Sequence, residues 1–300
     1  MNLVSSEDLS REEINEIFNI ADSLAGGHSE LSLKEHSTLA LFFEKPSTRT
    51  RVSFETAIIQ LGGSPIYIDA QTSQAKRGET IADTAKVLSG YCDFIAARMF
   101  KHSDIAELAA NSISPVINAL SDLEHPTQAL TDVYTIRHHF GNLRDLKIAF
   151  IGDVAANTAN SLMITAAKLG AEVALVGPKE CSPNVIYFNK AREYSKVWHY
   201  YESIQEGLED ADIVYTDTFV SMGEEADADR RRKLFAPYQL NSKALSYASP
   251  KALVMHCLPA HRGEEITADV IDGDRSIVWE QAKNKLLIAK AVLLFLSEKS

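Results

Sequence analysis

Short apolar runs alternate with helical patterns along all 300 residues of the chain. A buried run at 38–43 (TLALFF) is followed by a helical pattern from about Arg49 to the glycines at 62 and 63, and this order then repeats. Strands that alternate with helices form parallel sheets with helices on both faces, so this pattern constrains the fold more than any other feature. We therefore predict an α/β protein built from doubly wound parallel sheets.

The other elements are predicted from the same two periodicities. Ser10 and Glu13 have the spacing of a capping box, so the first helix is expected to open there and to run to about Leu24. Further helices are expected at 79–89, 103–111, 125–140, 157–169 and 282–297, and strands at 65–68, 94–99, 115–120, 146–151, 172–176, 213–216 and 253–256. The charged stretch at 223–233 is interpreted as a solvated helix or loop, with a mobile loop beside a site as the alternative.

The chain is long enough for two domains of about 150 residues each. The strand and helix pattern restarts near Gly141 and Asn142, directly after the long helical pattern at 125–140. The sequence contains no short-period repeat and no low-complexity segment. We therefore predict two α/β domains, the first at 1–138 and the second at 139–282.

The composition disfavours several classes of partner. A formal net charge of −11 argues against a surface for nucleic acid or an anionic membrane, although a few arginines can still hold a small anion. The first residues do not resemble a signal peptide, and apolar runs such as 291–296 are far shorter than the ~20 residues that span a bilayer. Three cysteines without a close pair fit a reducing compartment and offer no CxxC metal site. We expect a cytoplasmic protein.

Polar and basic residues gather where the strands of the first half end. The segment 47–51 (STRTR) joins the first strand to its helix, where hydroxyls, arginines and free backbone N–H groups form an anion cradle. An ordinary Ser/Thr helix cap with solvated arginines is the alternative. Arg98 ends a later strand, and His125 and Gln128 open the helix after the next one. Because ligands bind beyond the carboxyl ends of parallel strands, we expect these groups to face one crevice.

The second half has candidates of its own at strand ends. A turn at Gly152 is similar to a dinucleotide turn, but no glycine follows until Gly170, so the GxGxxG fingerprint is missing and a nicotinamide-dependent oxidoreductase is disfavoured. Asp217 follows a strand and is suited to hold an ammonium group, with a turn aspartate as the alternative. Cys257 follows another strand, as a nucleophile, a ligand or a small buried hydrophobe.

Taken in order, these motifs resemble those of the aspartate/ornithine carbamoyltransferase family. The segments 43–51 (FEKPSTRTR) and 125–128 (HPTQ), with Arg98 between them, are similar to the carbamoyl phosphate site of that family. The SMG tripeptide at 221–223 and the HCLP segment at 256–259 resemble the ornithine branch, whereas the aspartate branch has an HPLPR-type segment. The resemblance runs over essentially the whole chain.

The resemblance implies a transferase that moves the carbamoyl group of carbamoyl phosphate onto the side-chain amine of L-ornithine, giving L-citrulline and phosphate. The catalytic groups that it implies are Arg98, His125, Cys257 and Asp217. The first two, with Thr50, would polarise the carbamoyl oxygen, and the last two would orient the amine. The residues implied to hold carbamoyl phosphate are Ser47, Thr48, Arg49, Thr50, Gln74, Arg98, His125, Gln128, Cys257, Leu258 and Lys285. Those implied to hold ornithine are Asn157, Asp217, Ser221 and Met222.

The resemblance also implies an architecture and an assembly. The domain at 1–138, joined by the C-terminal helix at 283–300, would bind carbamoyl phosphate, and the domain at 139–282 would bind ornithine across a closing cleft. The chain would form a homotrimer with sites at subunit interfaces, where Gln74 would reach carbamoyl phosphate in a neighbouring subunit. No metal ion or organic cofactor is implied, and the metabolic direction is left open.

Two positions depart from the family pattern. Lys285 stands where the family has an arginine that touches carbamoyl phosphate, and lysine keeps the charge but loses the bidentate fork. Ala156 stands beside Asn157 where the ornithine branch usually has two asparagines. Two alternatives to an ornithine transferase therefore stay open. One is a transferase for another amine, such as putrescine, a modified ornithine or aspartate, and the other is a non-catalytic relative that binds carbamoyl phosphate.

Overall fold

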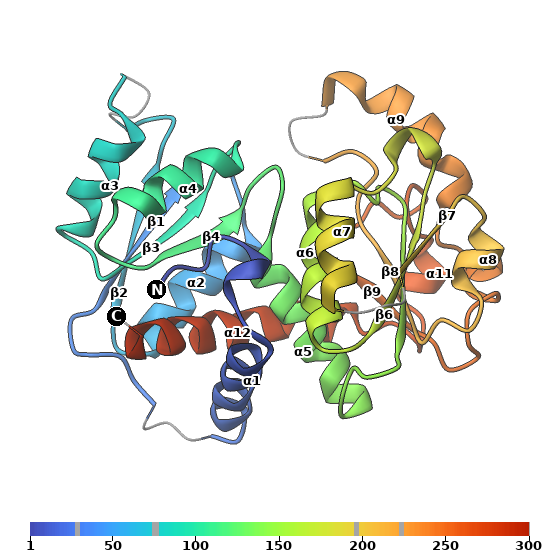
Figure 1. The fold of residues 1–300 in the computed structure, drawn as a ribbon, viewed down its shortest axis with the longest axis horizontal. Helices are drawn as coiled ribbons and strands as arrows, with labels where there is room; N and C mark the ends of the chain where they lie inside the picture. Colours follow the sequence, from blue (N-terminus) through green and yellow to red (C-terminus); the bar gives the residue numbers. More distant parts are fainter. Residues whose placement is uncertain (28–30, 74–77, 195–197, 222–224, 300) are drawn as a thin grey trace. The chain divides into compact units, whose positions relative to one another are not determined.

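The computed structural model describes residues 1–27, 31–73, 78–194, 198–221 and 225–299, and Figure 1 draws the path of the chain. The chain forms two compact units, one of residues 1–131 with 283–300 and the other of residues 132–282. Helices α5 (Pro126–Phe140) and α12 (Val278–Glu298) each run unbroken from one unit into the other. The division between the two compact units therefore falls inside two helices, and in α5 it lies before the restart of the sequence pattern at Gly141-Asn142, because the packing partners of a helix can change before its hydrophobic period ends.

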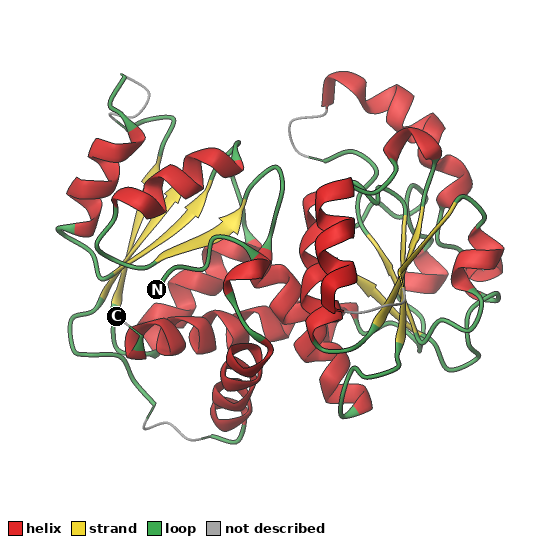
Figure 2. Cartoon of the chain, viewed as in Figure 1, coloured by secondary structure: helices red, strands yellow, loops and turns green. Residues whose placement is uncertain are grey.

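The first unit is a four-stranded parallel sheet with helices on both faces (Figures 1 and 2). Its strand order is β2-β1-β3-β4, with β1 (Thr38–Phe43), β2 (Ser64–Asp69), β3 (Phe94–Arg98) and β4 (Val116–Leu120). The helices before α5 are α1 (Arg11–Ala25), α2 (Arg49–Gln60), α3 (Ile81–Ser89) and α4 (His102–Asn111). Side chains such as Phe42 and Ile95 pack with Leu108 of α4 in the core on one face of this sheet. The predicted capping box opens α1, where Ser10 and Glu13 bond to each other's backbone N–H.

The second unit is a five-stranded parallel sheet, also covered on both faces (Figure 2). Its order is β7-β6-β5-β8-β9, with β5 (Lys147–Ile151), β6 (Glu172–Val176), β7 (Trp198–Tyr201), β8 (Ile213–Thr216) and β9 (Leu253–His256). Its helices are α6 (Asn157–Lys168), α7 (Val185–Tyr194), α8 (Ile204–Leu208), α9 (Ala228–Phe235), α10 (Ser242–Leu245) and α11 (Ala268–Ile271). Leu208, Leu245 and Ile271 bring α8, α10 and α11 onto one face of this sheet.

Both sheets are parallel and doubly wound, which confirms the predicted fold class, and every predicted strand is present. Strand β7 and helices α7, α8, α10 and α11 were not predicted, whereas α9 falls in the stretch that was interpreted as a solvated helix or loop. The β7 sequence (WHYY) has no aliphatic residue and lies at a sheet edge, so it lacks the apolar run that marks the other strands. Helix α9 lies in the charged stretch, where a buried Arg231 departs from the solvated interpretation.

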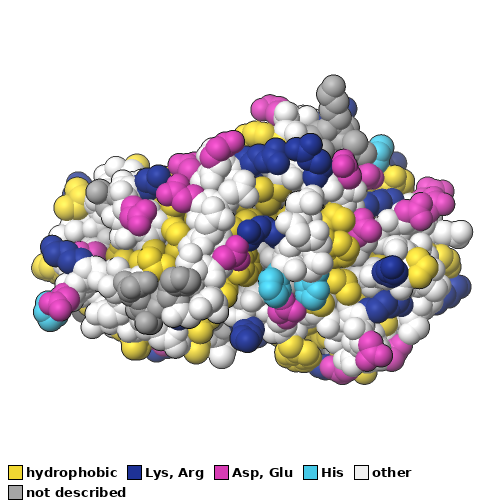
Figure 3. Space-filling model, turned by 90° about the horizontal axis from the view of Figure 1, so that it is seen from below, with side chains coloured by type: hydrophobic (Ala, Val, Ile, Leu, Met, Phe, Trp, Pro, Cys, Tyr) yellow, Lys and Arg dark blue, Asp and Glu magenta, His cyan; other side chains and the backbone are white. Residues whose placement is uncertain are grey.

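Charged side chains of both signs lie on the surface of the molecule. On the face drawn in Figure 3, acidic side chains are scattered among basic and apolar ones. The net charge of −11 is therefore not gathered into one field on that face. Within the described ranges, no helix combines the length and apolarity that crossing a membrane requires.

A buried polar network joins the crossing helices to the ends of two strands in the second unit. Asp132 of α5 accepts a hydrogen bond from the Tyr215 hydroxyl at 3.0 Å and another from the Gln281 amide of α12 at 2.7 Å. The Gln281 carbonyl oxygen accepts the His256 N–H at 3.0 Å. Burial and the adjacent Asp132 carboxylate raise the pKa of Tyr215 well above its ordinary value, so its hydroxyl keeps its proton and donates.

Replacing Asp132 by alanine is expected to destabilise the second unit by about 2–4 kcal/mol, because Tyr215 and Gln281 lose a buried charged acceptor. Both tryptophans, at positions 198 and 279, belong to this unit, so denaturant unfolding followed by tryptophan fluorescence reports on it. Asp132→Asn keeps one carbonyl acceptor and should lose less. An Asp132→Ala protein with the unfolding midpoint of the parent would contradict this account of the network.

Candidate functional site

Polar side chains lie at or just beyond the ends of three neighbouring strands of the first unit. Strand β1 leads into the segment 47–50, β3 ends at Arg98, and β4 leads to His125. The chain places β2 on one side of β1 and β3 on the other, so the winding direction reverses between β1 and β3. Doubly wound sheets open a ligand crevice at this kind of switch point. The predicted residues 47–50, Arg98 and His125 therefore gather at the carboxyl edge of one sheet. Of the others predicted to hold carbamoyl phosphate, Lys285 comes from α12, and Cys257 and Leu258 belong to the second unit.

The N-terminus of α2 provides the first part of this site. The Ser47 hydroxyl accepts the Thr50 N–H at 3.3 Å, and Thr48 makes no side-chain cap to the helix. Thr50 is buried, whereas Arg49 is exposed at the opening of the helix. The first turn of a helix carries N–H groups without intrahelical partners and the positive end of the helix dipole. With Arg49 beside them, these groups suit a phosphate.

Arg98 is the buried cation of this site. Ala97 pairs with Asn118 but Arg98 pairs with Leu120, so β4 has an extra residue here, and such a bulge re-aims the strand end. Arg98 is 8% exposed, and burial together with the charge of Arg49 lowers its pKa to about 10. Its Nε has no hydrogen-bond partner, and no carboxylate of the described residues pairs with the guanidinium. The group remains charged at neutral pH and lacks a counter-charge.

His125, Gln128 and Lys285 form a buried group in the same unit. The Lys285 ammonium donates to Gln128 Oε1 at 2.6 Å and lies 3.5 Å from His125 Nε2. Because an ammonium has no lone pair, this contact turns the Nε2 lone pair toward Lys285, and Nδ1 faces the Thr127 hydroxyl at 3.4 Å. Burial and the charges of Lys285 and Arg98 hold the pKa of His125 well below its ordinary value, so the imidazole is neutral at pH 7.

These groups make a site that is short of negative charge. Arg49, Arg98 and Lys285 are cationic, and the His125 imidazole between the two buried cations is neutral. A buried charge without a partner is costly, and a bound anion with further acceptor oxygens removes that cost. The first unit is therefore suited to a small anion with several acceptor oxygens, such as a phosphate group.

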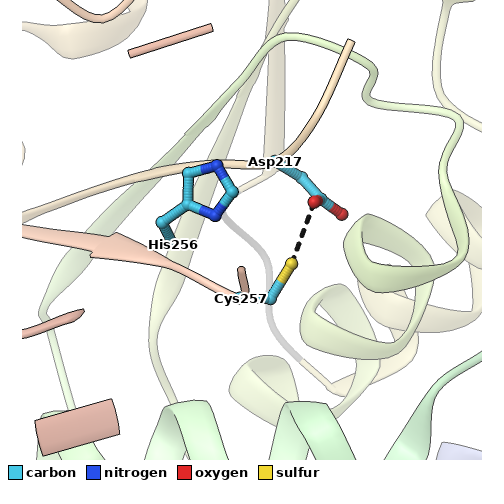
Figure 4. A group of neighbouring side chains, drawn as sticks. All are labelled: Asp217, His256 and Cys257. Atoms are coloured by element: carbon cyan, nitrogen blue, oxygen red, sulfur yellow. Dashed lines mark hydrogen bonds between the residues drawn. The ribbon is translucent and has the colours of Figure 1, made fainter. Parts of the chain in front are cut away.

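The second unit repeats this arrangement with different chemistry. Strand β5 lies between β6 and β8, so the winding direction reverses between β5 and β8. Asn157 opens α6 after β5, Asp217 follows β8, and Cys257 follows β9. Figure 4 shows Asp217 and Cys257 pointing toward each other from adjacent strand ends. The residues predicted to bind and orient the amine therefore follow three neighbouring strands.

Asp217 is the centre of a hydrogen-bonded group. Its Oδ1 accepts the Cys257 thiol at 2.9 Å and the Thr218 N–H at 2.7 Å, and its Oδ2 accepts the Thr158 hydroxyl at 2.8 Å. A sulfur that donates carries its proton, so Cys257 is held as a thiol and not as a nucleophilic thiolate. Asp217 is only partly buried, and each carboxylate oxygen can accept more than one donor. The group is suited to orient an amine.

Asp217, His256 and Cys257 have ligand atoms within 4.8 Å of one another, the spacing of a metal site. Figure 4 shows that the imidazole lies beside the other two side chains. Its Nδ1, however, already accepts the Leu258 N–H at 2.8 Å, and its Nε2 lies 3.1 Å from the Glu265 carboxylate. An ion would have to displace one of these bonds, so the residues fit a metal poorly. A second group with this spacing is His261, Glu264 and Glu265.

A buried ion pair supports the segment that leads to Ser221. Arg231 of α9 binds the Asp153 carboxylate, and its Nε donates to the Phe219 carbonyl oxygen at 2.8 Å. Asp153 follows Gly152, whose φ of +117° favours glycine. The segment after β8 is thus tied to the turn after β5, on which the start of α6 depends.

Two predicted site residues, Gln74 and Met222, lie outside the described residues. Asn157 is the first residue of α6, and Ala156 occupies the N-cap without a side-chain hydrogen bond. The next residue, Thr158, contacts Asp217 although it was not predicted. Its position in the first turn after a strand was the available signal.

The sequence also gave no indication of two buried pairs, Asp153 with Arg231 and His256 with Glu265. Arg231 stands in a charged run and Glu265 in a polar loop, which are typical of solvated residues. Such pairs depend on which loops meet in three dimensions, and no periodicity reports that.

Two family models match the chain. Residues 1–138 match the carbamoyl-P binding domain and residues 144–296 the Asp/Orn binding domain of aspartate/ornithine carbamoyltransferase. An ornithine carbamoyltransferase of Hyperthermus butylicus is 46% identical over 299 residues, which is 97% of this chain and 95% of the relative. The anabolic ornithine carbamoyltransferase of Pyrococcus furiosus is 49% identical over 265 residues, 87% and 84% of the two chains.

A solved structure of the ornithine carbamoyltransferase from Pyrococcus furiosus has the same fold. The TM-score is 0.92 at 44% identity, over 97% of this chain and 95% of that one. A family model thus matches each half, and the full-length relatives share close to half of their residues with the chain. The chain belongs to the aspartate/ornithine carbamoyltransferase family.

Proposed function

We propose that the chain transfers the carbamoyl group of carbamoyl phosphate to the side-chain amine of L-ornithine, giving L-citrulline and phosphate. The observation that carries the proposal is Arg98, a buried cation without a carboxylate partner at the edge of a sheet. A bound anion would supply the missing counter-charge. In the other unit, Asp217, with its bonds to Cys257 and Thr158, is suited to bind an amine. Relatives named ornithine carbamoyltransferase, at 46% and 49% identity, support ornithine as that amine.

The proposed reaction follows from where charge develops. The phosphate is held by the residues at the start of α2, namely Ser47, Thr48, Arg49 and Thr50. Arg98 donates to the carbamoyl oxygen, and Gln128 takes the carbamoyl nitrogen. The neutral His125 lies beside Arg98, and to donate as well its ring must carry the proton on Nε2, the tautomer opposite to the one that Lys285 favours in the free protein. As the amine adds, the carbonyl oxygen becomes anionic, and fixed donors in a dry site each contribute roughly 3–4 kcal/mol to its stabilisation. The carbon–oxygen bond to phosphate then breaks, and phosphate leaves as an anion that Arg49 stabilises.

The attacking amine has to be neutral, because only then does the nitrogen have a free lone pair. Asp217 and Cys257 orient it by hydrogen bonds, and as the carbon–nitrogen bond forms the nitrogen loses one proton, which the departing phosphate takes up. No covalent intermediate on Cys257 is needed, since direct attack completes the transfer. Asn157, Ser221 and Met222 are proposed to hold the α-amino and α-carboxylate groups of ornithine. Holding both reactants in place supplies much of the rate enhancement.

The proposal extends to direction and location. The relative from Pyrococcus furiosus is named anabolic, which supports the synthetic direction and a role in arginine biosynthesis. All three cysteines are free, and free thiols suit the reducing environment of the cytoplasm.

The choice of amine is tested by incubating the purified protein and carbamoyl phosphate with single amines. Turnover is expected with L-ornithine, and at least about 100-fold less with putrescine, N-acetylornithine, L-lysine and L-aspartate, because a site built for polar groups rejects analogues that leave them unpaired. The measurements are released phosphate and the mass of the carbamoylated product. Comparable turnover with another amine would refute the choice of ornithine but leave carbamoyl transfer itself in place. No turnover with any amine would favour a non-catalytic relative that binds carbamoyl phosphate.

The lysine at position 285 makes a prediction specific to this chain. Lys285→Arg is expected to lower the KM for carbamoyl phosphate about fivefold, because an arginine fork can hold Gln128 and a phosphate oxygen together, whereas the ammonium is directed to Gln128 at 2.6 Å. Lys283→Arg, two residues earlier and exposed, is the matched control and should leave the KM unchanged. Equal KM values for the parent and Lys285→Arg would show that the departure has no effect on binding.

The proposal includes a homotrimer in which Gln74 completes the carbamoyl phosphate site of a neighbouring subunit, as the resemblance implies. Arg98→Gln and Gln74→Ala are each expected to lose most activity alone. When the two variants are unfolded together, refolded and assayed, sites that combine an intact Arg98 with an intact Gln74 should restore a measurable part of it. A mixture no more active than its components, with mixed trimers verified by mass, would place Gln74 in its own subunit's site or outside it.

A further inference from the structure

Glu265 is a carboxylate whose side chain is 0% exposed, in the loop that follows β9. Its partner His256 is buried to the same degree, and no lysine or arginine pairs with Glu265 in the described ranges. A carboxylate buried in this way is costly unless specific donors hold it. Its contacts therefore show what the charge is used for.

The first contact fixes the tautomer of His256. Nδ1 of this ring accepts the Leu258 N–H at 2.8 Å, which requires a lone pair on Nδ1. In the neutral ring the proton is then on Nε2, which lies 3.1 Å from Glu265 Oε1 and donates to it. Glu265 Oε1 is the acceptor for that proton, so the contact favours this tautomer and with it the bond to Leu258.

The second contact closes the loop. The same Oε1 of Glu265 accepts the N–H of His261, so one carboxylate oxygen holds both the imidazole at the start of the loop and the backbone at its far side. The His256 N–H is held in turn by Gln281 at 3.0 Å. The groups that hold the loop, Gln281, His256 and Glu265, are buried, so the loop is held both at His256 and at the backbone of His261.

The contacts of Glu265 with His256 and with the His261 N–H, together with the His256–Leu258 bond, form what we call the clamp. Cys257 and Leu258 lie between its two ends. Leu258 has a φ of +60°, a left-handed conformation that residues with a Cβ adopt only when their surroundings hold it. The bond from its N–H to His256 supplies that support. Cys257 directly precedes it and donates its thiol to Asp217 at 2.9 Å. The position of the thiol against Asp217 therefore depends on the backbone that His256 and Glu265 fix.

We propose that Glu265 is a positioning residue for the transfer reaction, which through His256 holds the Cys257 thiol against Asp217 and so fixes the amine-binding group. In this proposal Glu265 contacts neither substrate, and all the residues through which it acts belong to the second unit. The proposal rests on the proposed function for its kinetic readout, whereas the state of the thiol tests it without turnover.

The clamp needs a side chain at position 265 that has the shape of glutamate and accepts the hydrogen bond from His256. A glutamine at position 265 can present its amide NH₂ group to His256 Nε2, which allows the opposite tautomer and loses the bond to Leu258. Glu265→Gln is therefore expected to weaken the clamp, and Glu265→Leu to remove it. Glu264→Gln is the matched control, because Glu264 is the adjacent carboxylate, is only partly buried and pairs with Arg232.

The experiment measures three quantities on the full-length parent and the three variants. They are the KM for L-ornithine, the KM for carbamoyl phosphate, and the rate at which iodoacetamide alkylates Cys257, read by mass spectrometry with Cys92 as the buried internal reference. In Glu265→Leu we expect the ornithine KM to rise at least tenfold, the carbamoyl phosphate KM to stay within twofold, and Cys257 to react at least threefold faster. Glu265→Gln should show the same pattern at smaller size, and Glu264→Gln none of it.

Three outcomes overturn the proposal. One is unchanged alkylation and an unchanged ornithine KM in folded Glu265→Leu. Another is a parallel rise of both KM values with a lower melting temperature, which is the mark of a merely structural residue. If Glu265→Leu does not fold, Glu265→Gln decides, and a Cys257 alkylation rate within 1.5-fold of the parent rejects the clamp. A parent without turnover refutes the proposed function but leaves the alkylation test of Glu265 intact.

Discussion

A guanidinium buried without a counter-charge is the constraint around which the first unit is arranged. Arg98 is held at the end of β3, where burial and the charge of Arg49 lower its pKa to about 10 without removing its proton at pH 7. The free protein therefore carries an electrostatic cost that an anion removes on binding, and by linkage the anion stabilises the fold. The neutral state of His125 has the same origin, since the charges of Lys285 and Arg98 disfavour a third cation beside them.

The two units use one geometry for two kinds of chemistry. In each, the functional side chains follow three neighbouring parallel strands that flank a switch point, at β1 and β3 in one unit and at β5 and β8 in the other. The first unit concentrates cations and helix N–H groups. The second presents the carboxylate of Asp217, already bonded to the thiol of Cys257 and the hydroxyl of Thr158. One unit is thus prepared for an anion and the other for an amine, which are the two reactants of a carbamoyl transfer.

Much of the fold could be predicted because buried parallel strands leave a strong trace in sequence. Runs such as 38–43 (TLALFF) are apolar at five successive positions, and the strand predicted there has the observed bounds. Strand β7 could not be predicted, since an edge strand does not need an apolar run. The point at which the compact units divide leaves no trace in the sequence for a related reason: a helix such as α5 keeps its pattern while its packing partners change.

Candidate site residues could be predicted where they end a strand, as Arg98 does, or directly follow one, as Asp217 and Cys257 do. The residues that hold them in place could not. Glu265 and Arg231 stand in polar segments whose composition is that of solvated loops, and only the tertiary fold buries them against His256 and Asp153. Local sequence carries the chemistry of a site, whereas its support comes from contacts between distant loops.

The most direct test of the central claim follows the new bond itself. Carbamoyl phosphate labelled with ¹³C at the carbonyl carbon is mixed with L-ornithine labelled with ¹⁵N only at the side-chain nitrogen, and the product is examined by NMR. The account predicts a ¹³C signal split by one-bond coupling to ¹⁵N, with inorganic phosphate formed in equal amount. A carbamoylated product without that coupling, or phosphate release without any carbon–nitrogen bond, would contradict transfer to the side-chain amine.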